Sequence, residues 1–194
     1  MFRRNLFGAV LALALAPLAT FASEVPAGSP ILEIDVAGEA NGTIRIALRP
    51  DLAPEHVARI IALVESDAYD NVVFHRVIEG FMAQTGDVQF GQAGASTAQA
   101  GMGGSDLPDL AAEFTDEPFE RGVMGMARSR SPDSANSQFF LMFEAATHLN
   151  GEYTVLGQII DGFEVLDAIK RGAGPNGAMI GVPDRMSDLR IVTE

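Results

Sequence analysis

Short runs of alternating apolar and polar residues, bounded by turn residues, constrain the fold of this chain more than any other feature. The segment ILEIDV at 31–36 alternates as a half-buried strand does. Asn41-Gly42 is a strong hairpin signal, and TIRIAL at 43–48 is the expected antiparallel partner. Later segments of strand character are expected at 72–78, 81–85, 122–128, 138–143, 153–160 and 188–193.

Two segments carry helical periodicity instead. In residues 50–66 apolar side chains recur at steps of three and four, and Pro54 suits a first helical position. Residues 161–172 form the second expected helix, with Asp161 as its cap and Gly172 as its end. Short strands with two helices far apart in sequence predict a mainly β fold, a closed antiparallel barrel. The small, glycine-rich residues 88–108 predict a long surface loop.

The first residues have the layout of a secretory signal peptide. Two early arginines precede an apolar run from Leu6 to Leu18, and small residues follow. The run is shorter than the ~20 residues that span a bilayer. We therefore expect a signal peptide at 1–22, a linker at 23–30 and one domain at 31–194. Export to the periplasm, with no membrane integration after cleavage, is the prediction, and a retained membrane anchor is the alternative.

Charge and composition exclude several classes of function. The formal net charge of −13 opposes binding to nucleic acid or to anionic lipid headgroups. The absence of cysteine excludes disulfides, thiolate nucleophiles and cysteine zinc sites. The histidines, His56, His75 and His148, lack a close metal-ligand spacing, so neither a metal nor a cofactor is expected. His56 lies on the first expected helix and is expected at the surface.

Arg76 occupies an unusual position, because it lies in an apolar stretch of sequence, where removing a guanidinium from water is costly. Taken alone, it would be a structural arginine held in a salt bridge. Period-two geometry, however, sorts polar and apolar side chains onto shared faces of three strands. Adjacent faces of this kind would form an apolar pocket edged by one guanidinium and two carboxamides, suited to a small apolar group bonded to a backbone amide. The three faces carry Phe74, Arg76 and Ile78; Met82 and Gln84; and Gln138, Phe140 and Met142.

Five segments resemble the cyclophilins, the peptidyl-prolyl cis-trans isomerases, in order and in spacing. The resemblance covers roughly residues 31–193 and is closest to bacterial forms of the family. It implies a barrel of roughly eight antiparallel strands capped by two α-helices, and isomerase activity (EC 5.2.1.8) that needs no cofactor or metal. The segments are FHRVIEGFMAQTGD at 74–87, GMGG at 101–104, GVMGMAR at 122–128, SANSQFFLMF at 134–143 and HLNGEYTVLGQI at 148–159.

The resemblance also implies roles for individual residues. Arg76 matches the catalytic arginine, which donates hydrogen bonds to the twisted amide, and Gln84 matches the amide that holds the substrate backbone. His75 matches a positioning histidine at the edge of the site. The apolar pocket for the proline ring matches Phe81, Met82, Phe140 and Leu149, while the neighbouring groove matches Ala127 and Gln138, with Gly101 at its rim.

The chain departs from the common cyclophilin pattern at four positions. Arg128 stands where many members have asparagine, a residue that holds substrate through its backbone, and Tyr153 stands where histidine is common. His148 replaces the tryptophan associated with tight cyclosporin binding, so weak binding of cyclosporin is expected. Thr85 replaces the first glycine of the usual Gly-Gly-Asp.

The function that the sequence predicts is isomerisation of Xaa-Pro bonds during the folding of exported proteins. The expected partners are proline-containing polypeptides, unfolded or partly folded, and the expected state is a monomer. Two alternatives stay open. One is a proline-binding chaperone or interaction module with the same fold and little turnover. The other is a structural barrel domain of an envelope complex, which would have no activity on peptides.

Overall fold

The computed structural model describes residues 25–96 and 98–193 of the chain. The leader predicted at 1–22 lies outside these residues. Within them, no helix combines the length and the apolar character that crossing a membrane requires.

Eight antiparallel strands form one sheet, which confirms the predicted mainly β fold. Along the sheet the strands follow the order β3-β4-β6-β5-β7-β2-β1-β8. Each neighbouring pair runs antiparallel. The strands are β1 (Ile31–Ala37), β2 (Gly42–Leu48), β3 (Arg76–Ile78), β4 (Met82–Thr85), β5 (Val123–Met126), β6 (Phe139–Met142), β7 (Val155–Asp161) and β8 (Arg185–Val192).

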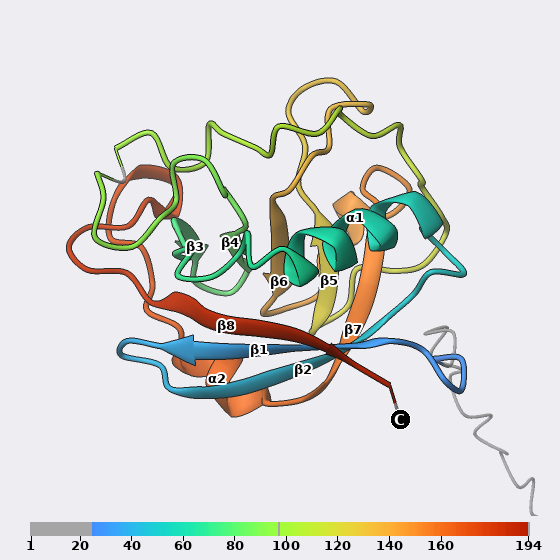
Figure 1. Cartoon of the computed structure of the whole chain (residues 1–194), viewed down its shortest axis with the longest axis horizontal. Coiled ribbons are helices and arrows are strands. Elements are labelled where there is room, and N and C mark those ends of the chain that lie inside the picture. Colours follow the sequence, from blue (N-terminus) through green and yellow to red (C-terminus); the bar gives the residue numbers. More distant parts are fainter. Residues whose placement is uncertain (1–24, 97, 194) are drawn as a thin grey trace, which may run out of the picture.

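The sheet curls into a barrel whose closure is partial (Figure 1). Its end strands, β3 and β8, meet only beside their first residues, where Val73 and Arg185 form an isolated bridge. The amide of Phe74 donates to the Asp184 carbonyl at 2.9 Å, and the Met186 amide donates to the Val72 carbonyl at 2.9 Å. The expected barrel is thus a curled half-barrel, because no ladder joins these two strands along their length.

Both predicted helices are present, and the second is shorter than expected. The helix α1 (Pro54–Glu65) begins at Pro54 as predicted and packs against β8. The helix α2 (Phe163–Ala168) packs against β2. Asp161 is not its cap, since it is the last residue of β7. The N-cap is Gly162, whose φ of 86° is left-handed and suits glycine. The helix ends at Ala168, four residues before the predicted Gly172.

The first hairpin is wider than the Asn41-Gly42 signal predicts. Val36 pairs with Gly42, so Gly42 belongs to β2, and residues 38–41 make the connection. The side-chain amide of Asn41 donates to the Gly38 carbonyl at 2.8 Å inside this loop. Asparagine and glycine therefore mark the turn correctly but not its length.

The strand expected at 72–78 is reduced to β3. Val72 pairs with Gln92 and Val73 pairs with Arg185, so the residues before β3 bridge two different segments instead of one partner strand. Phe74 consequently leaves the face that Arg76 and Ile78 were predicted to share with it, and joins the main core.

The two faces of the sheet carry two separate apolar clusters. Phe139 and Leu141 of β6 point into the main core inside the curled sheet, as predicted for Phe139. Phe140 and Met142 alternate with them and join Met82 in a smaller cluster on the outer face. The outer cluster includes residues of β4, β5 and β6, next to β3, which carries Arg76.

A long irregular segment, residues 86–122, runs along one side of the sheet (green to yellow in Figure 1). It includes the predicted loop at 88–108 and exceeds it. The buried carboxylate of Asp87 organises its first half by accepting backbone N–H groups of Gln89, Phe90, Gly101 and Gly103 at 2.7–3.1 Å.

Candidate functional site

Strand register places the predicted polar residues side by side. Arg76 of β3 pairs with Gln84 of β4, Gln84 pairs with Phe140 of β6, and Phe140 pairs with Gly125 of β5. Residues directly opposite one another in antiparallel strands project from the same face, so a guanidinium, a carboxamide and an aromatic ring line up across the outer face. The faces proposed from the sequence are therefore adjacent.

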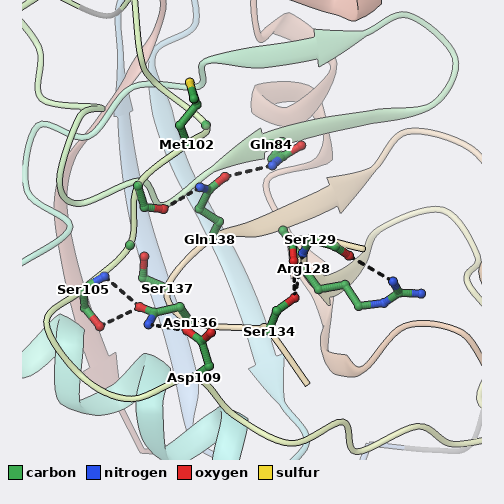
Figure 2. Close-up of a pocket in the computed structure, with 14 residues that line it drawn as sticks. Gln84, Met102, Ser105, Asp109, Arg128, Ser129, Ser134, Asn136, Ser137 and Gln138 are labelled. Carbon is green, nitrogen blue, oxygen red and sulfur yellow. Dashed lines mark hydrogen bonds between the residues drawn. The ribbon is translucent and has the colours of Figure 1, made fainter. Parts of the chain in front are cut away.

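A chain of hydrogen bonds fixes these side chains. Arg76 donates from Nε to the Asn176 carbonyl at 3.0 Å and from Nη1 to Gln84 Oε1 at 3.1 Å. Gln84 Nε2 donates to Gln138 Oε1 at 2.9 Å, and Gln138 Nε2 donates to the Gly103 carbonyl at 2.8 Å. The last two bonds are visible in Figure 2. The network runs from the loop before β8 to the glycine-rich loop.

The charge of Arg76 has no counter-ion among the described residues. Its two hydrogen-bond partners are a carbonyl and a carboxamide, both neutral. Partial burial lowers the pKa of the Arg76 guanidinium from its ordinary value, yet arginine stays protonated in proteins. The salt-bridged structural role considered for this residue does not fit, because no carboxylate of residues 25–96 or 98–193 pairs with it.

A cavity of about 390 Å³, the first cavity, opens beside Arg76. Its volume falls in the range of small-ligand sites. The ring of Phe140 is stacked on Phe119 with centroids 5.8 Å apart, and the Tyr153 ring meets both edge-on. The residues lining the cavity are Arg76, Phe81, Met82, Gln84, Ala127, Arg128, Phe140, His148, Leu149, Glu152 and Tyr153.

A second cavity of about 350 Å³ adjoins the first and shares Gln84, Ala127 and Arg128 with it. The glycine-rich loop and the turn before β6 make its other walls (Figure 2). Of the residues predicted for a neighbouring groove, Gly101, Ala127 and Gln138 all line it. The remaining lining residues are Met102, Gly103, Gly104, Ser105, Asp109, Ser129, Ser134, Asn136 and Ser137.

His75 lines neither cavity, although it was expected at the edge of the site. The side chain is buried, and a Cβ placed on Gly101 would lie 3.0 Å from its ring. Burial lowers the pKa of His75 to about 4, so the ring is neutral near pH 7. His75 therefore packs behind the rim glycine rather than facing the cavities.

The residues at the site that were missed from the sequence include Glu152, Asn176 and Met102, together with most of the lining of the second cavity. Glu152 lines the first cavity, the Asn176 carbonyl holds Arg76, and Met102 stands 79% exposed at the mouth of the second cavity. Met102 lies inside the GMGG segment, which could have identified it. Nothing local to Asn176 indicates its role, because it meets Arg76 across 100 positions of sequence.

His56 was expected at the surface and is fully buried, so that prediction is wrong. Its ring Nδ1 lies 2.7 Å from Glu113 Oε2, and the same carboxylate accepts the backbone N–H groups of Glu55 and His56. Burial raises the pKa of Glu113, but these hydrogen bonds outweigh it, and the pKa lies below its ordinary value. Glu113 thus caps α1 from the long segment and covers His56.

A metal centre finds no support in the geometry of the described residues. Among them, no three His, Asp or Glu side chains gather closely enough to hold a metal ion.

Comparison with known proteins gives a consistent result. Residues 31–191 match the family described as "Cyclophilin type peptidyl-prolyl cis-trans isomerase/CLD". A Brucella suis protein named "Probable peptidyl-prolyl cis-trans isomerase" is 48% identical over 180 residues, covering 92% of this chain and 89% of that protein. Mouse peptidyl-prolyl cis-trans isomerase-like 3 is 38% identical over 136 residues, covering 67% and 77%.

A solved structure extends the comparison. It is a cyclophilin-type isomerase of Cryptosporidium parvum, crystallised in the presence of the dipeptide Ala-Pro. The TM-score is 0.72 at 27% sequence identity, and the match covers 84% of this chain and 99% of that one.

Proposed function

Because this chain belongs to the cyclophilin-type peptidyl-prolyl cis-trans isomerases, we propose that Arg76 is the residue that accelerates its reaction. Rotation about an Xaa-Pro bond faces a barrier of ~18–20 kcal/mol, because amide resonance is lost on twisting. As the amide twists, the proline nitrogen becomes pyramidal and gains a lone pair that a guanidinium N–H can meet. Such a donor acts more strongly on the twisted form than on the planar one, as acceleration requires.

One observation carries this proposal: a guanidinium without a counter-ion among the described residues is held beside a cavity that is lined in part by apolar side chains. Arg76 uses one N–H on Asn176 and one on Gln84. A guanidinium has five N–H groups, so three remain for a substrate. The two existing bonds fix its plane before substrate arrives, which lowers the reorganisation needed at the moment of reaction.

The first cavity is the proposed seat of the proline ring. Its apolar lining of Phe81, Met82, Phe140 and Leu149 suits a saturated five-membered ring, and Gln84 would bond the substrate backbone. The Cryptosporidium relative was crystallised with Ala-Pro. We extend that chemistry to this chain and propose proline-containing, unfolded or partly folded polypeptides as its substrates.

The test is turnover of an Ala-Pro peptide by wild type, Arg76→Ala and Arg76→Lys. We expect kcat/KM of Arg76→Ala to fall about 100- to 1000-fold, the usual loss when one transition-state donor is removed. Arg76→Lys should recover little, because lysine lacks the planar fork. Arg130→Ala, which changes an exposed arginine outside both cavities, is the control and should match wild type.

Equal turnover by Arg76→Ala and wild type would refute the mechanism. Binding of proline peptides without turnover by any form would favour the chaperone alternative. Thermal melts of each variant separate a loss of chemistry from a loss of fold.

The proposal also covers the affinity of the enzyme for cyclosporin and its oligomeric state. His148 is exposed beside Phe81, with ring centroids 5.7 Å apart, in place of the tryptophan associated with tight cyclosporin binding. Cyclosporin is therefore proposed to bind weakly, and inhibition at nanomolar concentrations would disprove this. The enzyme is proposed to act as a monomer, and light scattering that gave twice the chain mass would contradict it.

Export is proposed from the leader alone. The clients would then be proteins that fold outside the inner membrane. Mass spectrometry of the protein recovered from the bacterial envelope should find Ser23 as the first residue. Recovery of an intact Met1 in the membrane fraction would instead support the retained anchor.

A further inference from the structure

Arg128 lies between the two cavities and lines both of them. It follows β5 by two positions, and Figure 2 shows it at the edge of the second cavity beside Ser129 and Ser134. A side chain in this place can meet a peptide whichever cavity its residues enter.

The conformation of Arg128 is fixed by its neighbours. Its Cζ lies 4.4 Å from the centroid of the Tyr153 ring and 5.9 Å from that of Phe114. Nε and Nη2 donate to the Glu152 carbonyl at 3.2 and 2.9 Å, and Nη1 donates to the Ser129 carbonyl at 3.1 Å. A guanidinium held by a ring contact and three hydrogen bonds loses little further freedom when it binds an anion.

The positive charge of Arg128 is poorly neutralised. Its ion pair within the described residues is with Glu152 Oε2 at 3.9 Å, and the Glu152 side chain is 68% exposed. Three of its five N–H groups are used on carbonyls, so two remain. Arg76 has no carboxylate partner in the part of the chain that the structure describes. The first cavity thus carries two guanidinium groups against one loosely placed carboxylate, on a chain whose net charge is −13.

We propose that Arg128 makes this enzyme selective for prolines that have an aspartate or glutamate within two residues. The inference rests on the proposed function, because it takes the first cavity as the seat of the proline. An extended chain advances ~3.3–3.6 Å per residue, so side chains flanking a proline held there come within reach of Arg128. A carboxylate of the substrate would accept hydrogen bonds from the two unused N–H groups of Arg128. These bonds would be charge-assisted, and such bonds are stronger than neutral ones.

A purely structural role for Arg128 makes a different prediction. As a clamp from the end of β5 to the Glu152 carbonyl, it would affect stability and would be indifferent to the charge of the substrate. The ratio of kcat/KM values between two peptides decides between the roles, because a general loss of activity cancels in that ratio.

The experiment compares peptides that carry glutamate, glutamine or lysine at one of four positions: two residues before, directly before, directly after or two residues after the proline. At low salt, wild type should prefer glutamate to glutamine about three- to tenfold in at least one position, with lysine below glutamine. About 0.5 M NaCl should reduce this preference, because the carboxylate approaches from solvent. Equal kcat/KM for glutamate and glutamine at every position would overturn the inference.

Three variants localise the effect. Arg128→Gln should bring the glutamate-to-glutamine ratio close to one, whereas Arg128→Lys should keep part of it. Arg130→Gln, an exposed neighbour outside both cavities, should keep the whole ratio. A full preference that survives in Arg128→Gln would assign it to another residue and overturn the inference. If Arg128→Gln proves unfolded in thermal melts, the wild-type series and Arg128→Lys still decide.

Failure of the Arg76 mechanism would look different. In that case the Arg76→Ala variant would turn over every peptide as fast as wild type does. Failure of the present inference would appear as indifference of wild type to substrate charge, with Arg76→Ala still impaired.

Discussion

His75 is a buried titratable side chain within one residue of Arg76. Neither of its ring nitrogens has a hydrogen-bond partner within the described part of the chain. Burial lowers its pKa to about 4, since the protonated ring would be desolvated. A neutral imidazole packed behind Gly101 supports the loop without adding a third charge next to the two arginines.

This burial predicts a dependence of stability on pH. Between the ordinary pKa of 6.5 and the folded value of about 4, the unfolded chain binds a proton that the folded chain does not. The contribution of His75 is therefore complete above pH 6.5 and is lost as the pH falls towards 4. Replacing it by phenylalanine should remove up to about 3 kcal/mol of the loss in unfolding free energy over this window.

Denaturant unfolding at several pH values measures the effect, because the slope with pH is independent of any constant cost of the substitution. His148→Gln is the matched control, since His148 is exposed, and its profile should follow wild type. Parallel profiles for His75→Phe and wild type would show that another group titrates in this window.

The place of a single residue can be predicted from sequence when its partners lie in regular elements or known motifs, and not when they lie far away in an irregular segment. Arg76, Gln84 and Phe140 could be placed together because a motif and strand alternation locate them. The burial of His56 could not, since the carboxylate that covers it lies 57 positions away in an irregular segment. The same holds for His75, whose place behind Gly101 depends on the path of a loop without periodicity.

At the scale of elements, β5 contributes to the site through a residue without a side chain, Gly125. Gly125 stands opposite Phe140, and a Cβ there would lie 2.6 Å from Phe119 Cε1 and 2.7 Å from Phe140 Cε2. No side chain fits that gap without moving a ring. The stacked rings of Phe119 and Phe140 can therefore lie flat against β5 and support the first cavity.

Gly125→Ala should consequently displace these rings. We expect a loss of about 1–3 kcal/mol in unfolding free energy from overpacking, together with a raised KM for proline peptides. In a Phe119→Leu background the same alanine should cost less, because the smaller side chain leaves room. Additive losses in the double-mutant cycle would mean that the rings do not respond to the new methyl group.

Elements were predictable where periodicity is regular and less so at their ends. The start of α1 followed from Pro54 and its apolar spacing. The end of α2 did not, because the chain leaves helical geometry at Ile169, and the next amide, that of Lys170, donates to the distant Asp184 carboxylate. Residues 72–74 have strand character since they are apolar and β-branched or aromatic. Val72 and Val73, however, bridge two different segments, and no local signal distinguishes one partner strand from several bridges.

At the scale of the whole molecule, the barrel and the segment 86–122 are built differently. The barrel is held by ladders and a continuous core, whereas the segment is fastened at separate points. Asp87 holds its first half, Asn136 accepts both the amide and the hydroxyl of Ser105 at 2.7 Å, and Glu113 fastens its second half to α1. The segment supplies a wall of the second cavity, so the site joins a part held by strand ladders to a part held by separate hydrogen bonds.

Such a construction predicts local opening that is separate from global unfolding. Asp87→Asn keeps the size of the side chain but replaces one acceptor oxygen by an NH₂ group, which cannot accept from the amides of Gly101 and Gly103. Hydrogen bonds to a charged group contribute about 1.5–3 kcal/mol, so these amides should exchange about ten- to a hundredfold faster. Amides of β1 and β2, which belong to the barrel, should keep the protection that they have in wild type.

Hydrogen exchange on the folded enzyme checks this, with Asp106→Asn as an exposed control in the same segment. The opened loop should also raise KM for peptides long enough to reach the second cavity, while a minimal Ala-Pro substrate, seated in the first cavity, should be affected less. If Asp87→Asn accelerated exchange equally in β1 and in the loop, the segment and the barrel would form one cooperative unit. The second cavity would then be as rigid as the first, because opening its wall would require unfolding the sheet itself.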